Sequence, residues 1–352
     1  MDCISMTETR CGYQLADVRK SLILAIEHRD KATAQRWAAE LVATPAAFGS
    51  LWAAYWISWA EAQSGPAIAI ILRQSWGEMT DSIYALEGDW PRIRNDSEVR
   101  RQVTALTIRM IDQPRPSPAY WPSKEVVQRD VALVRSSEEA ATIFDNVVKT
   151  VWQNIDDSME LRFLAGRFLH SIEAGDMRVC LSLLTWSLLP PAQQGLPLPL
   201  KVAERGPPSL PAKIRVSPLW FWLELGGAWI AHRGTSIHAG WRTMHAAVVS
   251  AFRDHYKRWT PGNRMSMLLA WTLLLRQSGQ PTVADTWVPK AVPALSLAEI
   301  DRPYREIAEE LANPDSVRRA VAKAAQEESN KTSSERKLAE SDALIMATLG
   351  LA

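Results

Sequence analysis

Cysteine is scarce in this sequence. Only three cysteines occur in 352 residues, Cys3, Cys11 and Cys180, and their spacing matches neither a disulfide framework nor a metal-binding pattern. This scarcity argues against a small secreted protein stabilised by disulfide bonds, and it is typical of a reducing compartment. We therefore expect a cytoplasmic protein, a location that includes the cytoplasm of an infected host cell.

Long apolar runs are also missing. No stretch reaches the roughly 18 uninterrupted apolar residues that a membrane-spanning helix needs. The polar start of the chain, MDCISMTETR, lacks the basic flank and the apolar run of a signal peptide. Because 47% of the residues are hydrophobic and 22% are charged, the composition is that of an ordinary globular protein. We expect a globular protein with no membrane contact.

The common catalytic motifs are absent as well. The sequence holds no Gly-x-x-x-x-Gly-Lys-Ser/Thr or Gly-x-Gly-x-x-Gly phosphate loop. It also holds no Gly-x-Ser-x-Gly elbow and no His-Glu-x-x-His helix. Adjacent acids occur at Asp156–Asp157 and Glu309–Glu310. Neighbouring positions point to different faces of a helix, so we expect both pairs to be solvated. The sequence predicts no enzymatic activity and no cofactor.

Four of the six histidines lie close together in the sequence: His232, His238, His245 and His255. His238 and His245 are separated by two helical turns, or roughly 10 Å along a helix axis. One metal ion with ligand bonds of about 2 Å cannot easily span that distance. We therefore expect surface or interface histidines and no metal site.

Helix signals, in contrast, run from one end of the chain to the other. The first segment places apolar residues at helical spacing on one face: Leu15, Val18, Leu22 and Ile26. Helix-starting caps precede several later segments: Asp30, Ser136 with Glu139, Ser217 before Pro218, and Ser296 with Glu299. No hairpin signal occurs, although residues 212–216 (AKIRV) leave room for a short β element. The sequence predicts an all-α protein.

Two proline-rich stretches interrupt this pattern. Residues 112–122 predict a loop, and residues 190–211 contain seven prolines in 22 residues, a density at which no helix persists. We therefore predict a helical domain over 1–189, a proline-rich linker over 190–212, and a basic, Trp-rich helical domain with a charged C-terminal helix over 213–352.

Tryptophan is unusually frequent, with 16 residues in the chain. In the stretch SLWAAYWISWAEAQSG, Trp52, Trp56 and Trp59 share one face of a helix, and the segment is apolar on nearly every side. Such a helix is buried, so we interpret the three indoles as core residues, with a subunit interface as the alternative.

Positive charge is concentrated in residues 201–276, which hold 11 Lys and Arg against 3 Asp and Glu. Basic side chains neutralise phosphates, and aromatic rings can stack on unpaired bases. Because tryptophans are interleaved with the basic residues, we predict a nucleic-acid surface, either DNA or RNA. The candidate binding residues are Arg233, Arg242, Arg253, Lys257, Arg258 and Arg264. The competing interpretation is that these tryptophans fill the core and the arginine stems pack on them.

Residues 10–63 carry a further pattern, formed by Gly12-Tyr13, Ser21-Leu22, Arg29-Asp30, Trp37-Ala38, Glu40-Leu41 and Leu51-Trp52. This pattern resembles the helical C-terminal domain of the clamp-loader-related AAA+ ATPases of the MgsA/RarA group, and stand-alone phage proteins that carry it. Arg29 stands where the family usually has Gly. The resemblance implies an oligomerising helical collar from DNA replication and repair. It transfers no catalytic residue, because the ATPase core has no counterpart in this chain.

The first functional hypothesis is therefore a phage- or virus-borne helical accessory or scaffold protein in nucleic-acid metabolism, which binds DNA or RNA through residues 213–276. The alternative is a structural or protein-interaction subunit of a larger assembly, with no nucleic-acid contact. In both hypotheses the protein is not an enzyme and associates with other proteins or with itself.

Overall fold

The computed structural model describes residues 7–61, 66–112, 122–136, 144–153, 155–189, 194, 200–206, 208–234, 240–255, 264, 267–268, 270–272, 275 and 294–313. Fourteen α-helices and no β-strand occur among these residues, which confirms the predicted all-α fold. None of the described helices is both long and apolar enough to cross a membrane.

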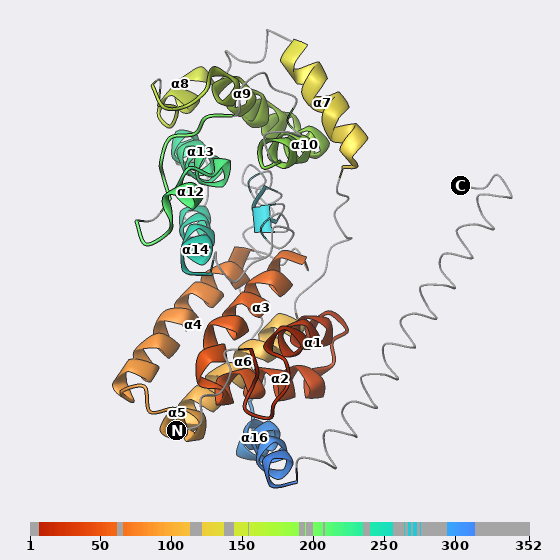
Figure 1. Cartoon of the computed structure of the whole chain (residues 1–352), viewed down its shortest axis with the longest axis vertical. Coiled ribbons are helices and arrows are strands. Elements are labelled where there is room, and N and C mark those ends of the chain that lie inside the picture. The colour runs from red at the N-terminus through yellow and green to blue at the C-terminus, as the bar shows by residue number, and fades with distance from the viewer. Residues whose placement is uncertain are drawn as a thin grey trace, which may run out of the picture.

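The N-terminal helices form one group, and α16, the last helix that the structure describes, joins them (Figure 1). This group contains α1 (Leu15–Glu27), α2 (Lys31–Ala43), α3 (Phe48–Glu61), α4 (Pro66–Ala85), α5 (Trp90–Asn95), α6 (Ser97–Ile111) and α16 (Leu297–Ala312). Helix α16 packs on α2 and α6, so residues almost 300 positions apart lie side by side.

The remaining helices form a second group above the first in Figure 1. They are α7 (Lys124–Ser136), α8 (Asp145–Lys149), α9 (Met159–Ala174), α10 (Met177–Ser187), α12 (Ala212–Arg215), α13 (Pro218–Arg233) and α14 (Gly240–His255). Helix α14 packs against α4 and α3 and thereby joins the two groups.

Local cap chemistry sets several helix starts. The Asp30 carboxylate accepts a hydrogen bond from the Thr33 backbone N–H at the start of α2. Ser296 and Glu299 form a reciprocal capping box at the start of α16, and Ser217 caps α13. Ser136 is the last residue of α7, and its expected partner Glu139 lies outside the described residues.

Residues 212–215 form the helical turn α12, so the β element that the sequence left open at 212–216 is wrong. The turn begins directly after Pro211, whose fixed φ suits the position before a helix, and the Val216 N–H bonds back to the carbonyl of Ala212. Local backbone geometry outweighs the apolar alternation here.

The main hydrophobic core is continuous across the predicted domain boundary. Its buried residues run from Val18 in α1 to Leu275, and they include side chains of both helix groups. Within the predicted linker, the described part contributes the buried residues Val202, Ala203 and Leu210. This part of the proline-rich segment therefore packs into the hydrophobic core.

The Trp-rich helix α3 lies in this core. Trp52, Trp56 and Trp59 are all fully buried within the single chain. Trp56 and Trp59 meet edge to face at 5.5 Å between ring centroids, and Trp52 meets Trp76 of α4 in the same way at 5.3 Å. Such contacts add to the large apolar area that each indole removes from water.

Candidate interaction surface

The basic residues expected to bind nucleic acid differ in their burial and in their ion pairs, as far as the structure describes them. Arg233 forms an ion pair with Glu173, and its guanidinium lies 5.4 Å from the centroid of the Trp229 ring. Arg253 forms an ion pair with Asp254 at 2.9 Å. Arg264 is half-buried and makes internal contacts. Lys257 and Arg258 lie outside the described residues.

Arg242 differs from these residues. It is exposed on α14 and forms no ion pair with any described residue. Arg253 lies 11 residues further along the same helix, three helical turns away, and is also exposed. Helix α14 thus carries two arginines on one solvent-facing side.

Most of the tryptophans that are interleaved with these basic residues in the sequence are buried. Five of them are buried in the core: Trp220, Trp222, Trp229, Trp241 and Trp271. Trp259 lies outside the described residues. An indole packed inside the core cannot stack on a nucleic-acid base, so these five tryptophans do not provide stacking contacts.

Much of the positive charge of residues 201–276 is also neutralised within the chain. Each of the following basic residues has an acidic partner: Lys201 with Asp156, Arg205 with Asp157, Arg215 with Glu204, Arg233 with Glu173, and Arg253 with Asp254. The charge excess seen in the sequence is therefore much smaller as a surface feature.

The histidines of this region have separate environments. His245 accepts a hydrogen bond at Nδ1 from Trp271 Nε1 at 3.2 Å, and burial lowers its pKa to about 4. His255 is buried and meets the Trp76 ring edge to face. His232 is exposed, and His238 lies outside the described residues. Within the described part of the chain, no three His, Cys, Asp or Glu side chains are placed to hold a metal ion.

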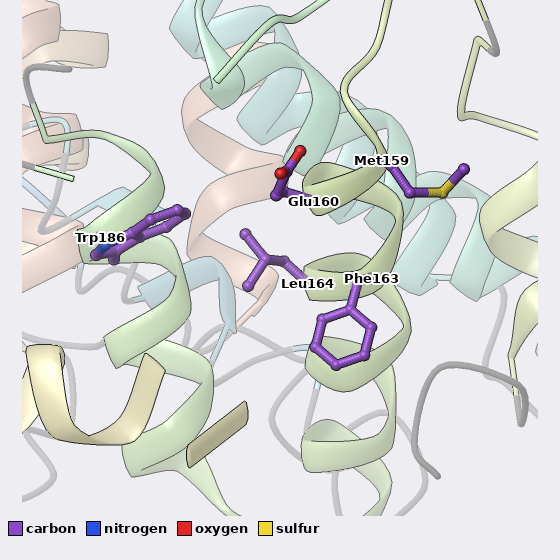
Figure 2. Close-up of a pocket in the computed structure, with 5 residues that line it drawn as sticks. All are labelled: Met159, Glu160, Phe163, Leu164 and Trp186. Carbon is purple, nitrogen blue, oxygen red and sulfur yellow. The ribbon is translucent and has the colours of Figure 1, made fainter. Parts of the chain in front are cut away.

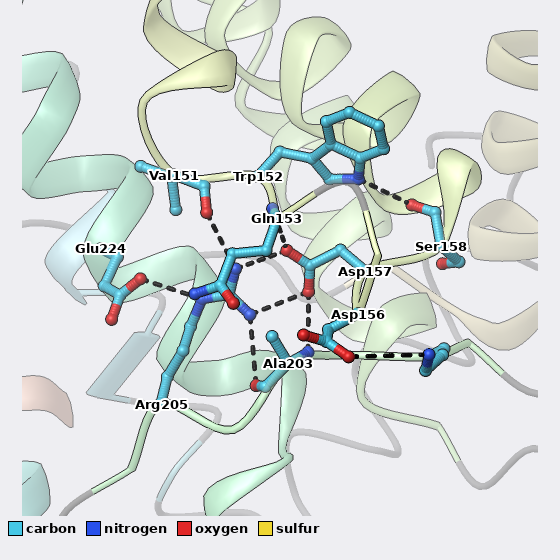
Figure 3. Close-up of polar contacts among 10 residues, drawn as sticks. Val151, Trp152, Gln153, Asp156, Asp157, Ser158, Ala203, Arg205 and Glu224 are labelled. Atoms are coloured by element: carbon cyan, nitrogen blue, oxygen red, sulfur yellow. Dashed lines mark hydrogen bonds and ion pairs between the residues drawn. The ribbon is translucent and has the colours of Figure 1, made fainter.

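The adjacent acids are not solvated as pairs, and this expectation is wrong. Asp156 is exposed, but Asp157 is buried and forms an ion pair with Arg205 at 2.5 Å, with side-chain exposures of 0% and 1% (Figure 3). Glu309 is exposed, but Glu310 is buried. Each buried carboxylate is matched by an arginine far away in sequence, which no local pattern reveals.

The Glu310 carboxylate joins α16 to the N-terminal helices. It accepts hydrogen bonds from the Tyr13 hydroxyl and from Arg36 Nη2, the latter at 2.5 Å. Arg36 Nη1 also binds Glu40 at 3.1 Å, and Glu40 accepts the Cys11 backbone N–H at 2.9 Å. Burial and the nearby carboxylates raise the pKa of the Cys11 thiol, so this thiol stays protonated and unreactive.

The four buried carboxylates of the described residues all face arginine. They are Glu40, Asp130, Asp157 and Glu310, and their partners are Arg36, Arg178, Arg205 and Arg36. Pairing with a guanidinium offsets the cost of removing a carboxylate from water. These pairs join segments that lie far apart in the sequence or, for Arg36 and Glu40, adjacent turns of one helix.

The Asp157 cluster fixes the loop that precedes α9. Asp157 accepts the Gln153 and Ala203 backbone N–H groups at 2.7 and 2.8 Å in addition to the Arg205 guanidinium. Arg205 also donates to the Val151 carbonyl at 2.8 Å and to Glu224 at 2.9 Å (Figure 3). Burial alone would raise the pKa of Asp157, but these donors outweigh it and the pKa is lowered.

Further hydrogen bonds hold the same loop at its other positions. Ser158 N–H donates to the Lys201 carbonyl at 2.9 Å, and Trp152 Nε1 donates to the Ser158 carbonyl at 3.2 Å. Lys201 Nζ donates to the Ile155 carbonyl at 3.0 Å. The Ile155 carbonyl is thus hydrogen-bonded, yet the Ile155 side chain is 86% exposed. Sequence reasoning missed this feature, because an isolated isoleucine in a polar loop gives no periodic signal.

A small apolar pocket lies directly after this loop, between α9 and α10 (Figure 2). Its volume is about 260 Å³, and its lining residues are Met159, Glu160, Phe163, Leu164 and Trp186. Met159 is 59% exposed at its edge. Figure 2 shows Glu160 and Leu164 on the side of α9 that faces Trp186. Glu160 is exposed and forms no ion pair with any described residue.

Ile155 and the residues that line this pocket are called the α9 surface below. It combines exposed apolar side chains, a concave site and a carboxylate, Glu160, that pairs with no basic side chain of the described residues. These are properties of a binding surface. No family model, no curated protein and no solved structure matches this chain.

Proposed function

We propose that this protein is a non-enzymatic helical scaffold subunit that binds another protein through the α9 surface. The observation that carries the proposal is the exposure of Ile155, a large apolar side chain that lies almost fully in solvent. The loop that carries it is anchored by the buried ion pair between Asp157 and Arg205. Ordering of the loop on binding costs little when the loop is already rigid, so such a residue suits an interface.

The environment of the tryptophans and arginines supports this choice over nucleic-acid binding. Five of the six indoles interleaved with the basic residues lie in the core, and several basic side chains have acidic partners within the chain. The buried carboxylates have arginine partners, which supports a non-catalytic role.

The assembly state of the full chain in cells that naturally produce it tests this proposal. We expect the wild-type protein to elute in a larger assembly than the isolated chain, and Ile155→Asp to return it to the size of the isolated chain. A charged side chain at the centre of an apolar contact opposes binding strongly. Tyr84→Asp is the matched control, because Tyr84 is 76% exposed on α4. Nuclease treatment should leave the assembly intact.

Binding of a nucleic-acid backbone through α14 is the second candidate. The exposed arginines Arg242 and Arg253 on one side of this helix favour it. If nuclease dissolves the assembly, and if the double change to Glu at these two positions does the same while Ile155→Asp does not, the second candidate replaces the first.

A further inference from the structure

We propose that the pocket of the α9 surface takes one large apolar side chain of a partner protein, with a neighbouring lysine or arginine of that partner paired to Glu160. This inference rests on the proposed function and adds the chemistry of the segment that docks.

The size of the pocket favours a side chain over a cofactor or a metabolite. Its volume of about 260 Å³ lies just below the range of roughly 300–1,000 Å³ typical of pockets for small-molecule ligands. Interfaces between proteins are commonly anchored by a single aromatic or aliphatic side chain that fills a small pocket. The apolar walls from Phe163, Leu164 and Trp186 suit such an anchor.

The polar groups of the pocket indicate the charge of the partner. The indole N–H of Trp186 is already used, because it donates to the Gln194 carbonyl at 3.0 Å, so this side chain presents its ring. Asp156 near the loop is neutralised by Lys201. Among the described residues Glu160 has no ion-pair partner, and a carboxylate is best matched by an ammonium or guanidinium group.

The loop before α9 adds the exposed apolar side chain of Ile155 to the α9 surface. Ile155 lies four residues before Met159 in the chain, and both side chains are exposed. Met159 lines the edge of the pocket. A partner segment that inserts its anchor would cover these two side chains as well. Apolar area around a central anchor excludes water from it, and this strengthens the charge pair at the edge of the contact.

Two fluorinated probes of equal shape and opposite charge test the inference on the full chain: 4-fluorophenethylamine and 3-(4-fluorophenyl)propionate. Fluorine NMR titrations measure the affinity of each probe. We expect the amine to bind about tenfold more tightly than the acid, since Glu160 attracts one and repels the other. Glu160→Gln should remove most of this preference, and Glu309→Gln, an exposed acid on α16, should leave it unchanged.

Met159→Ala tests the contribution of the apolar pocket to probe binding separately from the charge of Glu160. Met159 is largely exposed, so its truncation leaves the core intact and should weaken both probes alike. If the two probes bind the wild-type protein with equal affinity, or if the acid binds more tightly, the inferred lysine or arginine of the partner is wrong. Absence of binding by both probes would overturn the pocket as a site, while the assembly test with Ile155→Asp would still decide the proposed function. If the purified chain dimerises and Ile155→Asp abolishes the dimer, the occupant is a second copy, and the inference is wrong.

Discussion

Removal of the Asp157 carboxylate should destabilise the whole protein. Asp157→Ala leaves the Arg205 guanidinium buried, with 1% of its side chain exposed, and without its partner at 2.5 Å. Loss of one member of a buried ion pair typically costs about 3–5 kcal/mol. The partly exposed Glu224 still pairs with Arg205, so we expect the lower end of that range. This is a large part of a typical unfolding free energy of about 5–15 kcal/mol.

The adjacent residue provides the matched control. Asp156 is 57% exposed and lies 3.8 Å from Lys201, so Asp156→Ala removes a surface pair. Such pairs contribute about 0–1 kcal/mol. Urea unfolding followed by circular dichroism measures both variants. A double variant, Asp157→Leu with Arg205→Met, should be more stable than Asp157→Ala, since it leaves no unpaired charge in the core.

The stability that the Asp157 cluster contributes should also depend on pH. The pKa of Asp157 is lowered in the folded protein, so its contribution to stability is present above the pKa of the unfolded chain. This contribution is lost as the pH falls through the folded-state pKa. Equal and small effects of Asp157→Ala and Asp156→Ala at neutral pH would refute the conclusion that the buried pair fixes the loop.

Further variants test the core. Gly226→Ala should destabilise the protein by about 1–3 kcal/mol in urea unfolding, as expected for overpacking, because an added Cβ would lie 2.1 Å from Trp271 Cζ2. Gly77→Ala, where an added Cβ would lie 4.0 Å from Arg73 Nη1 in an ordinary contact, should stabilise α4 by up to about 1 kcal/mol. Trp56→Ala should cost roughly 3–5 kcal/mol, the range for truncation of a buried aromatic residue; stable Trp56→Ala protein would contradict its place in the core. Burial lowers the pKa of His245 from 6.5 to about 4, so the unfolded chain takes up the proton first, and stability should decline as the pH falls through this window. His245→Asn should decline less over the same window.

Much of the helical architecture follows from local sequence signals. Asp30 caps α2, and Ser296 with Glu299 forms the box at the start of α16, because these side chains bond to backbone groups two or three residues away. The apolar surroundings of Trp56 likewise placed its helix in the core, where the structure has it. Features that depend on neighbours in the chain are visible in the sequence.

The polar interior was not predictable in the same way. Asp157 and Arg205 are 48 residues apart, and Arg36 and Glu310 are 274 apart, so neither pair leaves a periodic pattern. The basic surplus of residues 201–276 was visible as composition, but the acids that neutralise it are brought close only by the fold. The loop before α9 depends on the Asp157–Arg205 pair, and for that reason the sequence did not reveal it.

Site-specific photo-crosslinking tests the central claim most directly. A photoreactive benzoylphenylalanine replaces Ile155 in the full chain, and matched chains carry it at Tyr84 or Arg242, all three being exposed positions. After irradiation of cells that naturally produce the protein, we predict one discrete adduct at position 155 that protease removes and nuclease does not. We predict no matching adduct at 84 or 242. A nuclease-sensitive adduct at position 242, with none at 155, would contradict the protein-binding account and favour nucleic-acid binding through α14.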